Sequence, residues 1–188
     1  MNITTKIIIT DTNIITDLNN ANVLEEFINL DNVYISDMIK NDEINSKIGN
    51  IKLINKFKVI SATPMQLMEV SSLSIIEKKL STYDLLNYVI ARDNHCILAT
   101  GDNRLKNYSE SNGVEVFRTL KIIKLMKHYN IISCRKVIDA CKLLKRCSTT
   151  RIPEVDINTL INELEKDSVA VWIFFFIWNI VIIVLCSI

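Results

Sequence analysis

The chain has 188 residues, of which 49% are hydrophobic, with only three glycines and two prolines. This composition is sufficient for one substantial core, and it leaves no flexible linker between two globular units. The five cysteines show neither CxxC nor Cys/His spacing, which argues against a zinc site or a disulfide framework. The first residues are polar and an acid follows at position 11, so we expect no signal peptide and place the folded part in the cytoplasm.

Five short runs rich in β-branched residues predict strands, and longer segments with helical spacing separate them. The predicted strands are Lys6–Thr10, Asn32–Ser36, Phe57–Ser61, Cys96–Thr100 and Val114–Phe117. The helical segments are Val23–Leu30, Met38–Ile48, Met65–Ala91 and Asn103–Asn112, and a further helix is expected to begin after Asp11. Alternation of strand and helix without hairpin signals predicts parallel βαβ units. The expected fold is therefore α/β, a three-layer α/β/α sandwich with a central parallel sheet.

The net charge is +1, but the charges are unevenly distributed. Residues 118–151 contain ten Lys and Arg residues and a single acid, Asp139. The apolar residues of this block recur on one side, as in an amphipathic helical pair with a positive outer face. An ordinary solvated surface mixes both signs, so the excess favours an anionic partner, either nucleic acid or an anionic membrane surface.

Four acidic positions adjoin the predicted elements. Asp11 and Asp102 follow strands, the pair Asp42/Glu43 comes after the second strand, and Asp84 opens a helical stretch. The carboxyl ends of parallel strands meet at one edge of the sheet, where open α/β sheets bind ligands. Grouped carboxylates repel one another unless a cation neutralises them. Together these acids predict a site for a hard metal ion such as Mg²⁺ or Mn²⁺.

Each carboxylate taken singly also has a structural explanation. Asp11 and Asp102 precede helical segments and are suited to be helix N-caps, a role worth about 1 kcal/mol. Asp84 stands three residues after Ser81, which is the spacing of a capping box. Only the acids as a group predict metal binding.

The motifs around these acids resemble the PIN domain family, of the VapC-like kind. The likeness covers about residues 6–126 and continues more weakly to Pro153. It is carried by Ile7-Ile8-Ile9-Thr10-Asp11-Thr12-Asn13, Tyr34-Ile35-Ser36-Asp37-Met38-Ile39, Leu80–Leu86 with Asp84, Ile97-Leu98-Ala99-Thr100-Gly101-Asp102-Asn103-Arg104-Leu105, and Gly113–Val116. The resemblance implies a metal-dependent ribonuclease, often the toxin of a toxin–antitoxin pair. RNA, a cognate antitoxin protein and a second copy of the chain are then the expected partners.

The resemblance also implies which residues do the chemistry. The catalytic and metal-binding acids would be Asp11, Glu43, Asp84 and Asp102, with Mg²⁺ or Mn²⁺ as the cofactor. Glu43 is favoured as the second acid because an apolar residue follows it, and Asp42 is the reserve. The bound metal would activate a water for in-line displacement at phosphorus, which leaves a 3′-hydroxyl and a 5′-phosphate.

Contacts with RNA are expected outside the acids, from Asn13, Thr100 and four lysines of the basic block, Lys121, Lys124, Lys142 and Lys145. Phosphate contacts of this kind weaken as salt rises. The alternative function is a catalytically inactive PIN-like module that binds RNA or protein, since the second acid is ambiguous.

We divide the chain into a PIN-like nuclease domain at 1–130, a C-terminal helical extension packed on it at 131–167, and a hydrophobic tail at 168–188. Val169–Cys186 contains one polar residue, Asn179, and has the length of a short membrane-spanning helix. Two interpretations remain open for this tail. One is a membrane tail anchor that leaves the nuclease domain in the cytoplasm. The other is a hydrophobic extension that arises from a shifted reading frame or a disrupted stop codon.

Overall fold

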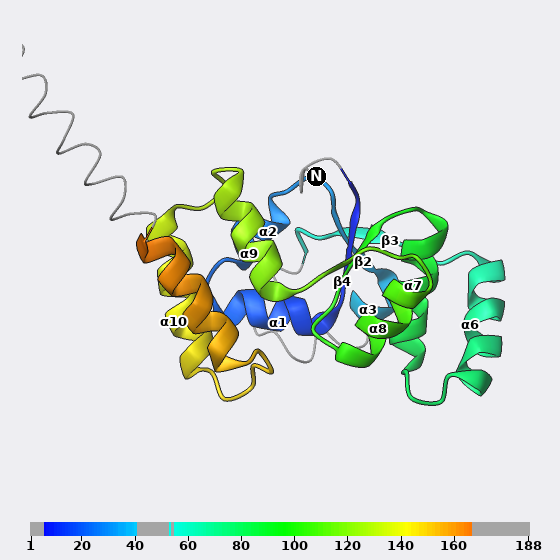
Figure 1. Ribbon diagram of the computed structural model, residues 1–188. Helices are drawn as coiled ribbons and strands as arrows, with labels where there is room; N and C mark the ends of the chain where they lie inside the picture. The colour runs from blue at the N-terminus through cyan, green and yellow to red at the C-terminus, as the bar shows by residue number, and fades with distance from the viewer. Residues whose placement is uncertain (1–5, 41–52, 54, 167–188) are drawn as a thin grey trace, which may run out of the picture.

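A parallel five-stranded sheet is the centre of the molecule (Figure 1). The computed structural model describes residues 6–40, 53 and 55–166. The strands lie in the order β3-β2-β1-β4-β5, and every neighbouring pair is parallel. Their bounds are Ile8–Thr10 for β1, Val33–Ser36 for β2, Lys58–Ile60 for β3, Ile97–Ala99 for β4 and Val116–Phe117 for β5. The predicted α/β fold with a central parallel sheet is confirmed.

Helices cover both faces of the sheet. Successive strand residues point to opposite sides, and apolar residues at successive positions therefore require a cover on each face. Ile8 packs into one hydrophobic cluster and Ile9 into another, and Ile97 and Leu98 divide in the same way. The first cluster includes residues of α1 (Thr12–Asn20), α2 (Leu24–Ile28), α9 (Thr119–His128) and α10 (Cys134–Arg146). The second includes residues of α6 (Pro64–Ile76), α7 (Thr82–Asp93) and α8 (Asn103–Ser111). These two clusters on either side of the sheet make the three predicted layers.

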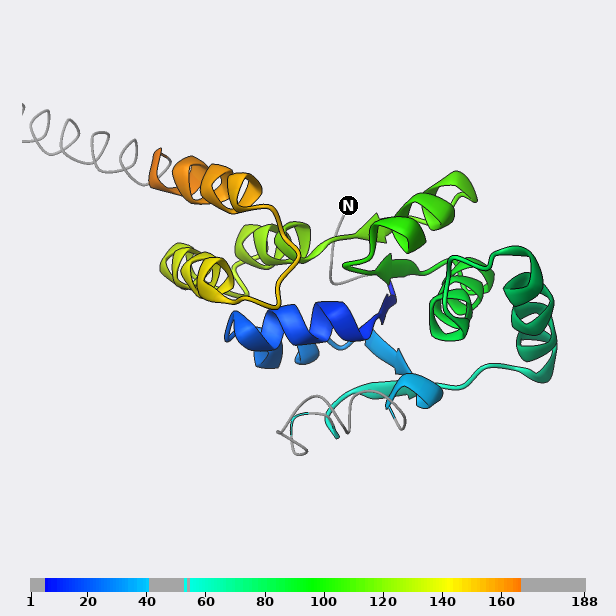
Figure 2. The ribbon, with the colours of Figure 1, turned by 90° about the horizontal axis from the view of Figure 1, so that it is seen from below.

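The segment Met65–Ala91, expected to be helical, contains two helices, the second beginning at the capping box expected at Ser81. The helix α6 ends at Ile76, and α7 begins at Thr82 after a short connection. Each has its own capping box, Thr63 with Gln66 and Ser81 with Asp84. Two capping boxes satisfy two sets of free backbone N–H groups, so two helix starts are stabilised where the apolar spacing alone predicts one. As Figure 2 shows, α6 then lies on the outer side of α7.

The C-terminal helices share the core of the sheet domain. Val137 and Leu144 of α10, and Ile157 and Leu160 of a helix over 154–166, are buried in the same cluster as Ile8. Figure 2 shows this last helix beside α9 and α10.

Three expectations concern residues outside the described ones. The predicted helix Met38–Ile48 is described only through α3 (Asp37–Ile39) and Lys40, and the tail at 168–188 is not described at all. Asp42 and Glu43 also lie outside the described residues. In the part of the chain that is described, no helix has the length and apolar character needed to cross a membrane.

Candidate active site

Asp11 lies at the carboxyl end of the central strand and is the most buried of the three described site acids. Its backbone N–H donates to the carbonyl oxygen of Ala99 at 2.9 Å, which extends the β1–β4 pairing by one residue. Asp11 is only 6% exposed, and its Oδ2 accepts hydrogen bonds from Thr100 Oγ1 at 2.9 Å and Asn13 Nδ2 at 3.1 Å. Asp11 is the N-cap residue of α1, as expected from the sequence, but its side chain makes no capping hydrogen bond to the helix. The carboxylate needs another reason to be buried here.

The surroundings of Asp11 raise its pKa to about 6 from a usual value of 3.8. The largest cause is burial, because a charged carboxylate loses favourable interactions with water. The negative charge of Asp84 raises the pKa further, while the hydrogen bonds from Thr100 and Asn13 oppose the shift. The site therefore disfavours the ionised acid unless a cation approaches it.

Asp84 stands in the first turn of α7, half-buried, and completes a capping box. Its Oδ2 accepts from the Ser81 backbone N–H at 2.9 Å and from Ser81 Oγ at 2.8 Å. The Asp84 backbone N–H donates back to Ser81 Oγ at 3.1 Å. The predicted capping role is confirmed, and the same side chain lies near enough to Asp11 to affect its pKa.

Asp102 caps α8, as expected from the sequence. Its Oδ1 accepts from the backbone N–H groups of Arg104 at 2.7 Å and Leu105 at 3.0 Å. Its own backbone N–H donates to Thr100 Oγ1 at 3.0 Å. The Thr100 hydroxyl thus donates to Asp11 and accepts from Asp102. It connects the end of β1 with the start of α8.

The three acids share a pattern in how their oxygens are used. In each, the described residues donate hydrogen bonds to one carboxylate oxygen only: Oδ2 of Asp11, Oδ2 of Asp84 and Oδ1 of Asp102. None of the ion pairs among the described residues involves these acids. Hard cations bind through oxygen, so this donor set fits Mg²⁺ or Mn²⁺ chemically. However, no three His, Cys, Asp or Glu side chains of the described residues are grouped closely enough to hold a metal ion.

Two of the lysines predicted to bind RNA are already paired with acids. Lys124 of α9 forms an ion pair with Glu163 at 2.6 Å, and Lys145 of α10 pairs with Glu154 at 2.7 Å. Both acids belong to the helix over 154–166, which packs beside α9 and α10. The positive surface of the basic block is therefore partly neutralised.

The other two predicted lysines have no ion pair within the described part of the chain. Lys142 is exposed on α10, and the Lys121 ammonium lies 3.9 Å from the ring centroid of Phe117. An aromatic ring is neutral, so the Lys121 ammonium keeps its charge available to an anion.

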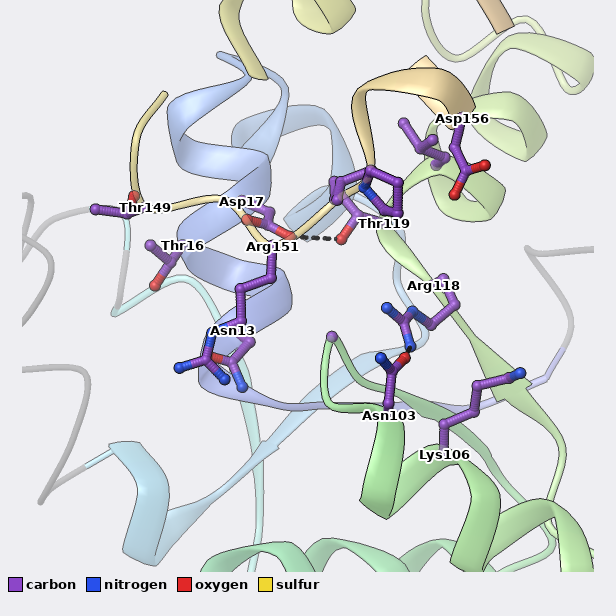
Figure 3. Close-up of a pocket in the computed structure, with 14 residues that line it drawn as sticks. Asn13, Thr16, Asp17, Asn103, Lys106, Arg118, Thr119, Thr149, Arg151 and Asp156 are labelled. Atoms are coloured by element: carbon purple, nitrogen blue, oxygen red, sulfur yellow. Dashed lines mark hydrogen bonds between the residues drawn. The ribbon is translucent and has the colours of Figure 1, made fainter. Parts of the chain in front are cut away.

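A cleft with a volume of about 350 Å³ lies between the start of α1 and the start of α8 (Figure 3). Its charged and polar lining includes Asn13, Lys106, Arg118, Arg151 and the buried Asp17. Figure 3 shows Arg118 and Lys106 on one side, and Asn13 and Arg151 on the other. Asn13 also donates to Asp11, so the cleft and the acidic site are contiguous.

Of these cleft residues, the sequence interpretation included only Asn13. One signal was present in Asp17, an acid between Ile14 and Leu18 on the apolar side of α1. A buried acid in an apolar stripe requires hydrogen-bond donors, and the structure supplies Thr119 and Thr150. Burial raises the pKa of Asp17, and both hydroxyls and the charge of Arg118 oppose that shift.

Comparison with solved structures identifies the fold. The chain is similar to the crystal structure of PAE2754 from Pyrobaculum aerophilum, with a TM-score of 0.50 and 18% sequence identity. The alignment covers 64% of this chain and 96% of that one. No family model and no curated protein sequence matches the chain. The fold is therefore PIN-like.

We expect Asp11→Asn to stabilise the metal-free protein at neutral pH. The pKa of Asp11 is about 6 in the folded state and takes its usual value of 3.8 in the unfolded chain. The folded chain therefore holds the proton more tightly than the unfolded chain. The free energy of unfolding of the wild type therefore falls as pH rises through this interval, by about 3 kcal/mol in total. Asparagine keeps an acceptor oxygen for Thr100, so the variant escapes this loss.

Urea unfolding in EDTA tests this expectation on either side of the interval. The free energy of unfolding of Asp11→Asn should exceed that of the wild type above about pH 7, and this difference should disappear near pH 4. Asp139→Asn, at an exposed acid of α10, is the matched control and should show no such gain. Equal stabilities of Asp11→Asn and wild type at both pH values would contradict the raised pKa.

Proposed function

We propose that this chain is a metal-dependent ribonuclease that hydrolyses RNA phosphodiester bonds at the carboxyl edge of its sheet. The observation that carries the proposal is Asp11, a buried carboxylate on a PIN-like fold that faces a second acid and has no described cationic partner. A buried, repelled carboxylate costs stability, and such strained groups gather at functional sites. A bound cation would offset both the burial and the repulsion.

The residues that would hold Mg²⁺ or Mn²⁺ are Asp11, Asp84 and Asp102, together with Glu43 or, in reserve, Asp42. When bound, the metal supplies Lewis-acid chemistry that lowers the pKa of a water and offsets charge on the phosphate. Hydrolysis would join the water oxygen to phosphorus and break the P–O3′ bond, with one water proton passing to the 3′ oxygen, and would leave a 3′-hydroxyl and a 5′-phosphate. Thr100 orients Asp11 by donating to Oδ2, so that Oδ1 is the oxygen left for a ligand. Outer hydrogen bonds of this kind typically change metal affinity or activity 10- to 100-fold.

One observation favours the second candidate, an inactive PIN-like module that binds RNA or protein. Asp84 and Asp102 each use one carboxylate oxygen to cap a helix, and the described residues contain no complete group of three ligands. Purified protein that binds RNA but never cleaves it, with Mg²⁺ or Mn²⁺ present, would support this candidate.

The toxin role and a cognate antitoxin are further parts of the proposal. An inhibitory protein that restores growth when co-expressed would support them.

Replacing Asp11 with Asn should abolish Mn²⁺-dependent cleavage of single-stranded RNA while the fold persists. We expect a loss of roughly 100-fold or more, because a ligand contributes at least as much as the groups that orient it. The assay follows a fluorescent RNA with Mn²⁺, with EDTA in a parallel reaction. Asp139→Asn should retain activity within about twofold, since exposed charges of this kind contribute little.

Metal binding has a readout that does not depend on activity. Mn²⁺ should raise the melting temperature of the wild type and of Asp139→Asn, because a ligand that binds only the folded state stabilises it. Asp11→Asn should gain nothing from the metal. A wild type that melts at the same temperature with Mn²⁺ and with EDTA would refute the metal site.

The lysines of the basic block should differ in their contribution to RNA binding. Lys121 and Lys142 are free of ion pairs among the described residues, whereas Lys124 and Lys145 are paired with acids. Replacing Lys121 and Lys142 with Gln should therefore reduce the slope of log affinity against log salt by about 1.4, or about 0.7 per phosphate contact on a single strand. Fluorescence anisotropy in EDTA measures this slope.

The Lys124→Gln/Lys145→Gln double variant removes the same formal charge and is the matched comparison. Its slope should change by less, because Glu163 and Glu154 already compete with RNA for these two ammonium groups. An unchanged slope in both double variants would mean that this face is a solvated surface.

A further inference from the structure

Two arginines of the cleft have no carboxylate partner in an ion pair among the described residues. Arg118 Nη1 donates to Asn103 Oδ1 at 2.6 Å, so a neutral amide orients the guanidinium without neutralising it. Arg151 is exposed and lines the same cleft. Arginine presents a planar set of donors that matches phosphate oxygens. The cleft also holds Lys106 and the acids Asp17 and Asp156, so its three basic residues exceed its two acids and favour an anion.

A single buried carboxylate holds the two segments that carry these arginines. Asp17 is 8% exposed; its Oδ2 accepts from Thr119 Oγ1 at 2.7 Å and its Oδ1 accepts from Thr150 Oγ1 at 3.2 Å. Thr119 directly follows Arg118, and Thr150 directly precedes Arg151. Residues more than 30 positions apart are thereby attached to the same turn of α1. Asp17 uses both of its oxygens for this purpose.

The cleft begins where the acidic site ends. Asn13 lines the cleft, and its Nδ2 donates to Asp11 Oδ2 at 3.1 Å. Gly101 lines it too, and a Cβ added at this position would lie 3.1 Å from Asn13 Cβ. Glycine therefore permits the close approach of the Gly101 turn to the first turn of α1, and an anion in the cleft would be a near neighbour of Asp11.

We propose that this cleft binds one backbone phosphodiester of the RNA strand, next to the one that is cleaved, through Arg118 and Arg151. Asp17 is the positioning residue for both arginines. This inference rests on the proposed function, because the position of the bound phosphate is defined relative to the cleavage point. The cleft would fix which linkage of the strand reaches Asp11.

Steady-state cleavage of a fluorescent single-stranded RNA by the full chain with Mn²⁺ is the first test. Arg118→Gln and Arg151→Gln should each raise KM about tenfold, the effect of losing one charge-assisted hydrogen bond, with kcat changed much less. Arg146→Gln, an exposed arginine of α10 outside the cleft, is the matched control and should leave KM within about twofold. A KM unchanged in the double variant Arg118→Gln/Arg151→Gln overturns the inference.

Neutral linkages locate the bound phosphate. A series of RNAs, each with a single methylphosphonate at a different linkage near the cleavage point, should include one position that raises the wild-type KM without blocking cleavage. In the double variant that position should lose its effect, because its partners are gone. Equal sensitivity of wild type and double variant at every position contradicts a phosphate contact in the cleft. An effect that needs a 5′-terminal phosphate contradicts a backbone contact.

Failure of this inference is distinguishable from failure of the proposed function. If the wild type cleaves RNA with Mn²⁺ but the arginine variants behave like Arg146→Gln, only the cleft assignment falls. If the wild type does not cleave, anisotropy with the same RNAs in EDTA still compares the variants. If only the double arginine variant binds RNA more weakly, and one methylphosphonate position weakens binding of the wild type but not of that variant, the cleft contacts RNA although the protein does not cleave it.

The positioning role of Asp17 has its own pair of variants. Asp17→Asn keeps a polar group for both threonine hydroxyls and removes a negative charge from the cleft, so KM should stay equal to or fall below that of the wild type. Asp17→Ala loses both hydrogen bonds and should raise KM about as much as the double arginine variant, with the Mn²⁺-dependent rise in melting temperature retained. Equal effects of Ala and Asn on KM would contradict the positioning role.

Discussion

The parallel pairing of β1 with β4 determines where every described residue of the candidate site lies. It brings Thr10 opposite Ala99, so the residues that follow, Asp11 and Thr100, leave the sheet together at its carboxyl edge. The Thr100 hydroxyl then connects Asp11 with the start of α8. A change of register by one residue would turn Thr100 to the other face of the sheet and leave Asp11 buried without its donor. The site therefore depends on the core, because the same pairing buries Ile8, Ile9, Ile97 and Leu98.

The acids differ in what their positions contribute to stability. Asp84 and Asp102 cap helices, so each stabilises the fold with one oxygen and leaves the other for chemistry. The Asp11 side chain makes no capping hydrogen bond, and its burial and the repulsion from Asp84 both raise its pKa. Of the three described site acids, Asp11 is thus the one whose burial carries an electrostatic cost. Such a cost is expected where a protein retains a strained group for its function.

Local sequence patterns were sufficient for the strands and for the helix caps at Asp84 and Asp102, because both depend on neighbouring residues. The alternation of apolar runs and helical segments identified the sheet, and the Ser81–Asp84 spacing identified a capping box that the structure confirms. The same spacing indicated a helix start at Ser81, where α7 begins, and the structure shows that α6 precedes it as a separate helix. The pairing of Lys124 with Glu163 was not predictable, since it depends on how a later helix packs beside α9.

Two buried acids, Asp11 and Asp17, stand before and within α1, and their hydrogen bonds separate what they can do. Asp17 accepts one hydroxyl on each oxygen, so both oxygens already have a hydrogen-bond donor. Asp11 accepts both of its hydrogen bonds on Oδ2, so Oδ1 has no described donor. A cation that enters this edge therefore meets the less occupied carboxylate at the start of α1, while the arginines beside Asp17 repel it. The same helix can thus present a cation site at its N-terminus and an anion site about one and a half turns further on, without competition between the two.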